Sequence, residues 1–272
     1  MNSTQVVSPY FKYWLIFKMY WQGLLAYPLS FFSWRLRQIL STFTSLTFWS
    51  VLYLGTADAF GYNRSQMISY IFLTAFLQSI IQSTLLSGLA EDIYTGVISN
   101  TLVKPVKMFA MWVSQEIADK SMNLFFVICE SLLLLYIFKP QIILPDMTQL
   151  FLFVLATILG ATLLFYIMLL FGTIGFWSAE TWGIRFLLYM FMDITAGKLY
   201  PLDILPAAVR KVLFLTPFPY LAYVQTQLFL GKYSLAETGH IFLVLGGWVV
   251  GLAFLFHVVW NHGLKSYGAA GR

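Results

Sequence analysis

Long apolar stretches alternate with short polar segments along almost the whole chain. The apolar stretches lie at about 36–54, 67–86, 108–138, 148–177, 184–200 and 238–260. About 20 apolar residues in helical form cross the hydrocarbon of a bilayer, where backbone polar groups must be paired within a helix or a closed barrel. The pattern therefore predicts an all-α membrane protein with six transmembrane helices, built as a single transmembrane domain over residues 1–272.

Two segments outside these stretches carry a different pattern. Residues 8–29 are rich in aromatic side chains but are interrupted by two lysines and a proline. This favours a helix lying in the membrane interface over a further span, because aromatic rings and lysine side chains both suit that layer. Residues 197–235 hold four prolines and only short apolar pieces. Irregular backbone at membrane depth must be buried in protein or face water, so we expect short re-entrant helices at the outer face, near 201–230.

Composition and charge agree with a membrane protein. The chain is 60% hydrophobic and 10% charged, whereas soluble domains carry about 25% charged residues. The net charge of +5 comes from scattered lysines and arginines, so it indicates contact with membrane lipids and not with nucleic acid. With the N-terminus inside, ten basic residues fall on the cytoplasmic side and six outside. Because cytoplasmic loops are enriched in Lys and Arg, this favours cytoplasmic N- and C-termini.

The polar segment 87–107 lies between the second and third apolar stretches. Glu91 and Asp92 near its start suit the positive N-terminal end of a helix, and Lys104-Pro105 near its end would stop that helix. The residue before a proline avoids helical geometry. We expect an exposed helix near 91–100 that docks on a cytosolic partner. A merely polar intracellular loop capped by acids accounts for the same residues.

Several motifs in a fixed order resemble those of six-span permease subunits of ABC exporters. They are Ser87-Gly88-Leu89-Ala90-Glu91-Asp92-Ile93 through Gly96, Leu102-Val103-Lys104-Pro105, Phe176-Trp177, Gly197, Pro201-Leu202, Leu205-Pro206, and Pro217-Phe218 with Tyr220. The resemblance covers nearly the whole chain and is to type-two ABC permeases of the daunorubicin and multidrug exporter kind. The resemblance implies an ATP-driven export function in the inner (plasma) membrane of a prokaryotic cell.

The resemblance also implies partners and coupling residues. Separate ABC ATPase subunits would hold ATP and Mg²⁺, so this chain would be neither an enzyme nor a cofactor-binding protein, and its sequence contains no P-loop motif. A second permease, a distinct related chain, would complete the transporter, although a homodimer also fits. The residues that couple to the ATPase would be Glu91, Asp92, Ile93, Gly96, Val97, Lys104 and Pro105.

Four polar side chains within the apolar stretches are candidates for a substrate pathway: Glu130, Asp193, Gln78 and Gln82. An acid inside a membrane is costly and is a functional candidate by default. Glu130 could bind a cationic substrate, relay a proton or pair with a partner subunit, but an internal hydrogen bond in the helix bundle or protonation in place explains it equally well. Gln78 and Gln82 lie one helical turn apart and either line a path or join helices. The alternative function is an ion-coupled secondary transporter that uses Glu130 and Asp193 and needs no ATPase.

The remaining charged residues and the histidines indicate structural roles and not a catalytic or metal site. Glu116, Asp119 and Lys120 predict a cluster of ion pairs, with Glu116 and Lys120 in the favourable i, i+4 order. The three histidines do not have the spacing of a metal site, and no nucleophile motif supports a membrane hydrolase. A non-transporting subunit that only anchors an ATPase stays open as a further alternative.

Overall fold

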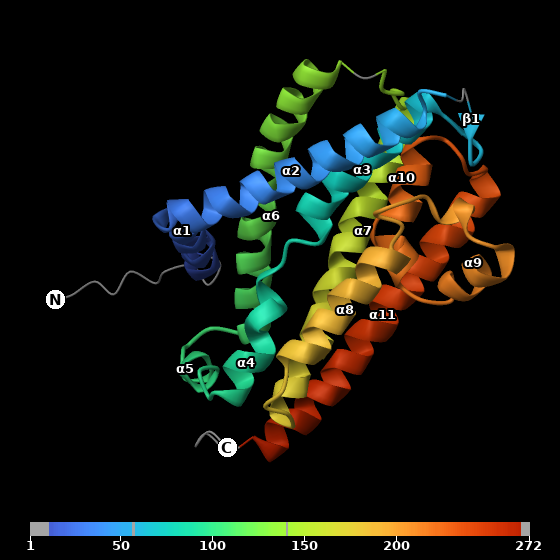
Figure 1. Cartoon of the computed structure of the whole chain (residues 1–272). Helices are drawn as coiled ribbons and strands as arrows, with labels where there is room; N and C mark the ends of the chain where they lie inside the picture. The colour runs from blue at the N-terminus through green and yellow to red at the C-terminus, as the bar shows by residue number, and fades with distance from the viewer. Residues whose placement is uncertain (1–10, 56–57, 140, 268–272) are drawn as a thin grey trace.

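The computed structural model describes residues 11–55, 58–139 and 141–267, and nearly all its regular structure is helical (Figure 1). The longer helices are α1 (Phe11–Ala26), α2 (Pro28–Leu52), α3 (Arg64–Ile81), α6 (Met108–Phe138), α7 (Met147–Gly172), α8 (Trp182–Thr195) and α11 (Leu235–Ser266). The shorter elements are β1 (Asp58–Ala59), β2 (Tyr62–Asn63), η1 (Leu85–Gly88), α4 (Leu89–Tyr94), α5 (Ser99–Leu102), η2 (Thr173–Phe176), η3 (Leu202–Ile204), α9 (Ala207–Leu213), η4 (Phe218–Leu221) and α10 (Tyr223–Phe229).

Each of the six predicted apolar stretches holds one of these longer helices, namely α2, α3, α6, α7, α8 and α11 in order. Among the described helices, α6, α7 continued by η2, and α11 are long and apolar enough to cross a membrane. A fourth span is reached if α3 and the segment 85–94, bent by 58° relative to it, count as one broken span. The all-α membrane class is confirmed, while the number of six spans stays a prediction.

Helix α7 lies at the centre of the bundle. It packs along α11 and also contacts α10, α3 and α4, while α2 packs on α3 and α1 packs on α6. Figure 1 shows two ends of the molecule: β1 and α9 lie at one, which we call the β1 end, and α4, α5 and the last turn of α11 lie at the other, which we call the α4 end.

Three of the long helices begin with a capping box. The N-cap residues Asn63, Asp146 and Ser234 each accept a hydrogen bond from the backbone three residues on, and the side chains of Gln66, Gln149 and Glu237 bond back to them. Each box satisfies two backbone donors that a helix start leaves unpaired. These boxes give helices α3, α7 and α11 defined first turns. All three helices begin at the β1 end (Figure 1).

The N-terminal helix lies against the first half of α6. The Lys12 ammonium donates to the carbonyl of Pro105 at 3.0 Å, and the Trp21 indole donates to the Ser121 hydroxyl at 2.8 Å. The interfacial position predicted for residues 8–29 stays a prediction, and residues 8–10 of it lie outside the described residues. Helix α1 covers the part of α6 that follows the polar segment.

Candidate functional site

The polar segment after α3 contains two short helices and not one. Helix α4 ends at Tyr94 and α5 begins at Ser99. Gly96 lies between them with φ +82°, and its amide bonds back to the carbonyl of Ile93 at 3.2 Å. A glycine with positive φ ends a helix, because it is the residue that adopts this conformation without steric cost. The continuous helix predicted over 91–100 is therefore wrong, and Gly96 is the physical reason.

One side of this segment packs into the subunit. Ile93 and Ile98 are 1% and 4% exposed, so their apolar contacts are internal. A Cβ at Gly175 would overlap the carbonyl of Ala90, and one at Gly172 would overlap the side chain of Leu89. Only glycine allows the end of α7 and η2 to approach α4 this closely. Because Ile93 is buried within the subunit, the expectation that it offers an apolar contact to a partner is wrong.

The other side of the segment is exposed. Glu91 and Asp92 face outward at the start of α4, and Val97 and Val103 are 51% and 83% exposed. Lys104 and Pro105 are also exposed and follow α5 directly. We call Glu91, Asp92, Val97, Leu102 and Val103 the docking face. It combines two acids with aliphatic side chains that are out of contact with the core.

Lys120 holds the end of α3. Its ammonium donates to the carbonyls of Ile80, Ile81 and Ser83 at 3.0, 3.3 and 2.9 Å. The last carbonyls of a helix have no partner within it, so Lys120 satisfies them with a positive charge, which suits a helix C-terminus. The same ammonium lies 3.2 Å from Glu116 Oε1, which confirms the predicted i, i+4 pair.

Glu116 holds the start of the next helix. Its Oε2 accepts hydrogen bonds from the Thr84 hydroxyl at 3.2 Å and from the Leu85 amide at 3.4 Å. We call Glu116 and Lys120 the clamp. From neighbouring turns of α6, Lys120 bonds the end of α3 and Glu116 bonds the start of η1, so together they hold the bend between the two elements. Helix α8 adds a third connection, because the Arg185 guanidinium donates to the Ser87 carbonyl at 2.5 Å.

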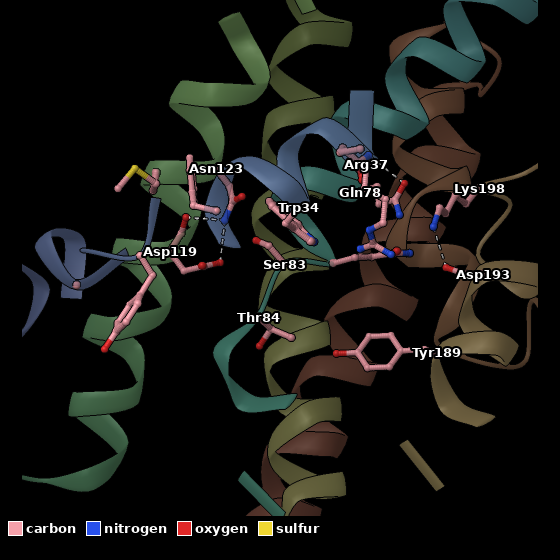
Figure 2. Close-up of a pocket in the computed structure, with 16 residues that line it drawn as sticks. Trp34, Arg37, Gln78, Ser83, Thr84, Asp119, Asn123, Tyr189, Asp193 and Lys198 are labelled. Carbon is pink, nitrogen blue, oxygen red and sulfur yellow. Dashed lines mark hydrogen bonds and ion pairs between the residues drawn. The ribbon is translucent and has the colours of Figure 1, made fainter. Parts of the chain in front are cut away.

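A cavity of about 690 Å³ lies between α2, the end of α3, α6 and α8 (Figure 2). Its lining residues are Gly23, Tyr27, Phe31, Trp34, Arg37, Gln38, Gln78, Gln82, Ser83, Thr84, Asp119, Met122, Asn123, Tyr189, Asp193 and Lys198. Three of the four predicted pathway residues are thus brought together: Gln78 and Gln82 from α3 and its C-terminal cap, and Asp193 from α8. Gln78 accepts a hydrogen bond from Gln38 at 3.2 Å, and Asp193 pairs with Lys198 at 3.0 Å.

Glu130, the fourth predicted pathway residue, does not line this cavity. Its carboxylate lies 3.3 Å from the guanidinium of Arg35, and the two side chains are 12% and 4% exposed. Arg35 is further enclosed by the rings of Phe31, Trp34 and Phe126, with ring centres 5.5, 4.8 and 5.3 Å from its Cζ. Among the alternatives for Glu130, the geometry supports an internal structural pair.

Arg35 also corrects the sequence interpretation. It is one of the ten basic residues that the sequence places on the cytoplasmic side, at the end of the first apolar stretch, but only 3% of it is exposed. A guanidinium is stable in such a position because a carboxylate and aromatic faces replace its water. Arg35 therefore gives no information about membrane orientation, and Arg37, two residues on, is the exposed arginine of this helix.

A comparison with protein families decides the class. The model of the family described as ABC-2 family transporter protein matches residues 39–271, which is most of the chain. The chain belongs to the ABC-2 transporter family. It is therefore a multi-pass membrane protein and a permease component of an ABC transport system. No curated protein sequence matches it.

The sequence reasoning did not assign several residues of this ABC-2 permease to the places that they occupy, and it put Asp119 in a cluster of ion pairs. Arg37, Asp119 and Tyr189 line the cavity, and Arg185 and Gly175 fasten the segment that carries the docking face. Arg35 and Arg37, at the start of the first apolar stretch, were a usable signal, because a charged side chain at membrane depth is costly unless it has a partner. The partners themselves are distant in sequence and leave no local pattern.

The β1 end of the permease has its own polar centre. Asp203 in η3 accepts hydrogen bonds from the hydroxyls of Tyr62 and Tyr223, both at 2.6 Å, and from the Gln227 amide at 2.8 Å. Arg210 pairs with the same carboxylate at 3.3 Å. Burial raises the pKa of the Tyr62 hydroxyl, and its bond to Asp203 adds to this rise. The hydroxyl therefore stays protonated across the physiological pH range and can donate to Asp203.

Proposed function

We propose that this permease is the membrane subunit of an ATP-driven exporter in the inner membrane of a prokaryotic cell. In this proposal it has six spans, both termini lie in the cytoplasm, and the α4 end faces the cytoplasm. Cytosolic ATPase subunits hold ATP and Mg²⁺ and bind the docking face. The observation that carries the proposal is the structure of the segment 85–106. This segment exposes acids and aliphatic side chains, and it is held in place by contacts with α6, α7 and α8.

Such ties suit the transmission of movement. An ATPase that shifts the docking face would move the ends of several long helices together, because a packed segment moves as a unit and not as a loose loop. The bend of 58° between α3 and the segment 85–94 gives the chain one place where the angle can change. ATP binding would then shift the population between inward- and outward-facing states.

The proposal includes a second permease, a distinct related chain, that completes the pathway beside this one. The rival of an ion-coupled transporter using Glu130 and Asp193 finds less support in the geometry. Each of these acids is already paired with a cation of the same subunit, at 3.3 Å for Glu130 and 3.0 Å for Asp193.

The double substitution Glu91→Ala and Asp92→Ala tests the docking face. We expect the amount of P-loop ATPase that co-purifies with the tagged permease to fall about tenfold, because exposed acids that meet basic residues of a partner make charge-assisted hydrogen bonds. The permease itself should accumulate and fold normally, since both side chains point outward. Quantitative mass spectrometry of the purified complex measures the ratio.

The matched control is Asp58→Ala, which removes an exposed acid at the β1 end. We expect it to leave the ATPase ratio unchanged. Full retention of the ATPase by the double variant would remove the two acids from the coupling contact.

A further inference from the structure

We propose that the cavity between α2, α6 and α8 binds a zwitterionic amphiphile, a small molecule with a cationic nitrogen group, an anionic group and an aromatic or other apolar body. The proposal rests on the proposed transport function only in taking this molecule as cargo. The binding itself follows from the charges and surfaces of the cavity.

The first charge is the carboxylate of Asp119. Asp119 is 8% exposed and lines the cavity, and it accepts a hydrogen bond from the Asn123 amide at 2.9 Å. Within the described residues it makes no ion pair. Arg35 and Lys120, the cations whose field it feels, are each paired with another carboxylate, Glu130 and Glu116 respectively. A buried charge of this kind calls for a partner, and a cationic group in the cavity supplies one.

The second charge is the guanidinium of Arg37. It lines the same cavity, and in the part of the chain that the structure describes it has no hydrogen bond, ion pair or ring contact. In the view of Figure 2, Trp34 and Ser83 lie between Asp119 and Arg37. Arginine binds carboxylate and phosphate through paired N–H donors. An anionic group is therefore the complement at this end.

The other charges of the cavity cancel. Lys198 and Asp193 pair with each other at 3.0 Å, which leaves the carboxylate of Asp119 and the guanidinium of Arg37 as one negative and one positive group without an ion-pair partner in the described lining. A ligand of net charge +1 would leave Arg37 without a partner, and one of net charge −1 would leave Asp119 without one. A zwitterion satisfies both.

The space between the charged ends suits an apolar body. Tyr27, Phe31, Trp34 and Tyr189 contribute aromatic surface, and Gln82 contributes a buried amide nitrogen that has no hydrogen-bond partner in the described structure. A volume of about 690 Å³ lies within the range of sites for drug-sized molecules. The aromatic faces also favour a delocalised cation.

Two dyes that differ in one charge test this inference. Rhodamine B carries a delocalised cation and a carboxylate, whereas its ethyl ester keeps the cation and lacks the anion. We expect the full-length permease in lipid nanodiscs to bind rhodamine B about tenfold more tightly than the ester, as measured by fluorescence anisotropy after subtraction of empty nanodiscs. The difference reports the charge-assisted contact with Arg37.

Two variants assign the two ends. Arg37→Gln should bring the affinities for the two dyes together without weakening the ester, because only the anion loses its partner. Asp119→Asn should weaken both dyes about tenfold. Arg64→Gln is the control, since Arg64 is an exposed arginine that lines a different cavity at the β1 end, and it should change neither affinity.

Equal affinity of the normal protein for the two dyes, or no binding of either, would overturn the inference. An unchanged preference in Arg37→Gln would overturn it as well, and this exposed side chain can be replaced without disturbing the fold. Because the assay needs no ATPase, loss of the ATPase contact would refute the proposed function and leave these binding results intact.

Discussion

Arg35→Met is expected to destabilise the permease by about 3–5 kcal/mol, which is the usual effect of removing one member of a buried ion pair. The substitution keeps most of the apolar stem but leaves the Glu130 carboxylate, whose side chain is 12% exposed, without its cation. It also removes the donor to Asn123 Oδ1. Thermal unfolding of the detergent-purified protein, followed by loss of the monodisperse peak, measures the change.

Arg37→Met is the matched control for stability. It replaces the same residue type two positions along the same helix, but Arg37 is exposed and has no partner in the described structure. We expect a change within about 0.5 kcal/mol. The double substitution Arg35→Met with Glu130→Met should be less harmful than the sum of the single changes, since neither charge is then left alone. An additive result, or an Arg35→Met protein as stable as normal, would contradict the buried pair.

Lys120→Met is expected to release the segment between α3 and α6 while the bundle stays folded. The change removes the donor to three backbone carbonyls and the cation beside Glu116. Hydrogen bonds to a charged group contribute about 1.5–3 kcal/mol each, so the amides of 85–103 should exchange with solvent at least tenfold faster. Hydrogen–deuterium exchange with mass spectrometry resolves this segment from α7 and α11, whose exchange should not change.

Lys107→Met controls for the loss of a lysine near the start of α6, because this side chain is exposed. It should leave the exchange of 85–103 as it is. If Lys120→Met behaved in the same way, the clamp would not hold the bend, and the ties to α7 and α8 alone would have to position the docking face. In the proposed coupling the clamp transmits movement between the docking face and α6, so we expect the co-purified ATPase to show a lower hydrolysis rate with Lys120→Met.

Hydrophobic pattern alone located the helices of this permease well. All six apolar stretches contain a helix, because burial in lipid or protein demands continuous apolar sequence and leaves a strong signal. The bend after Ile81 and the turn at Gly96 were harder to foresee. They depend on a single glycine and on contacts with α6, and neither changes the overall pattern of polar and apolar residues.

The candidate sites show the same division. Gln78, Gln82 and Asp193 could be selected from sequence because polar groups are rare in apolar stretches, and the structure brings them to one cavity. The pair of Glu130 with Arg35 could not, since the partners are 95 positions apart. Whether Ile93 faces the subunit or a partner depends on which side of α4 packs against α7. Helix α4 has six residues, too few for the hydrophobic periodicity of the sequence to predict its buried side.

The central claim, that the docking face touches an ATPase, is tested most directly by cross-linking. Cys129 is the one cysteine of the sequence, so Cys129→Ser provides a background for Val97→Cys carrying a photoactivated cross-linker. Leu144→Cys, at a position 84% exposed on the connection to α7 at the β1 end, serves as the comparison. We predict that cross-linking in native membranes joins a P-loop ATPase to position 97 and not to position 144. Absence of an ATPase from the products at 97, or equal labelling from both positions, would contradict the account.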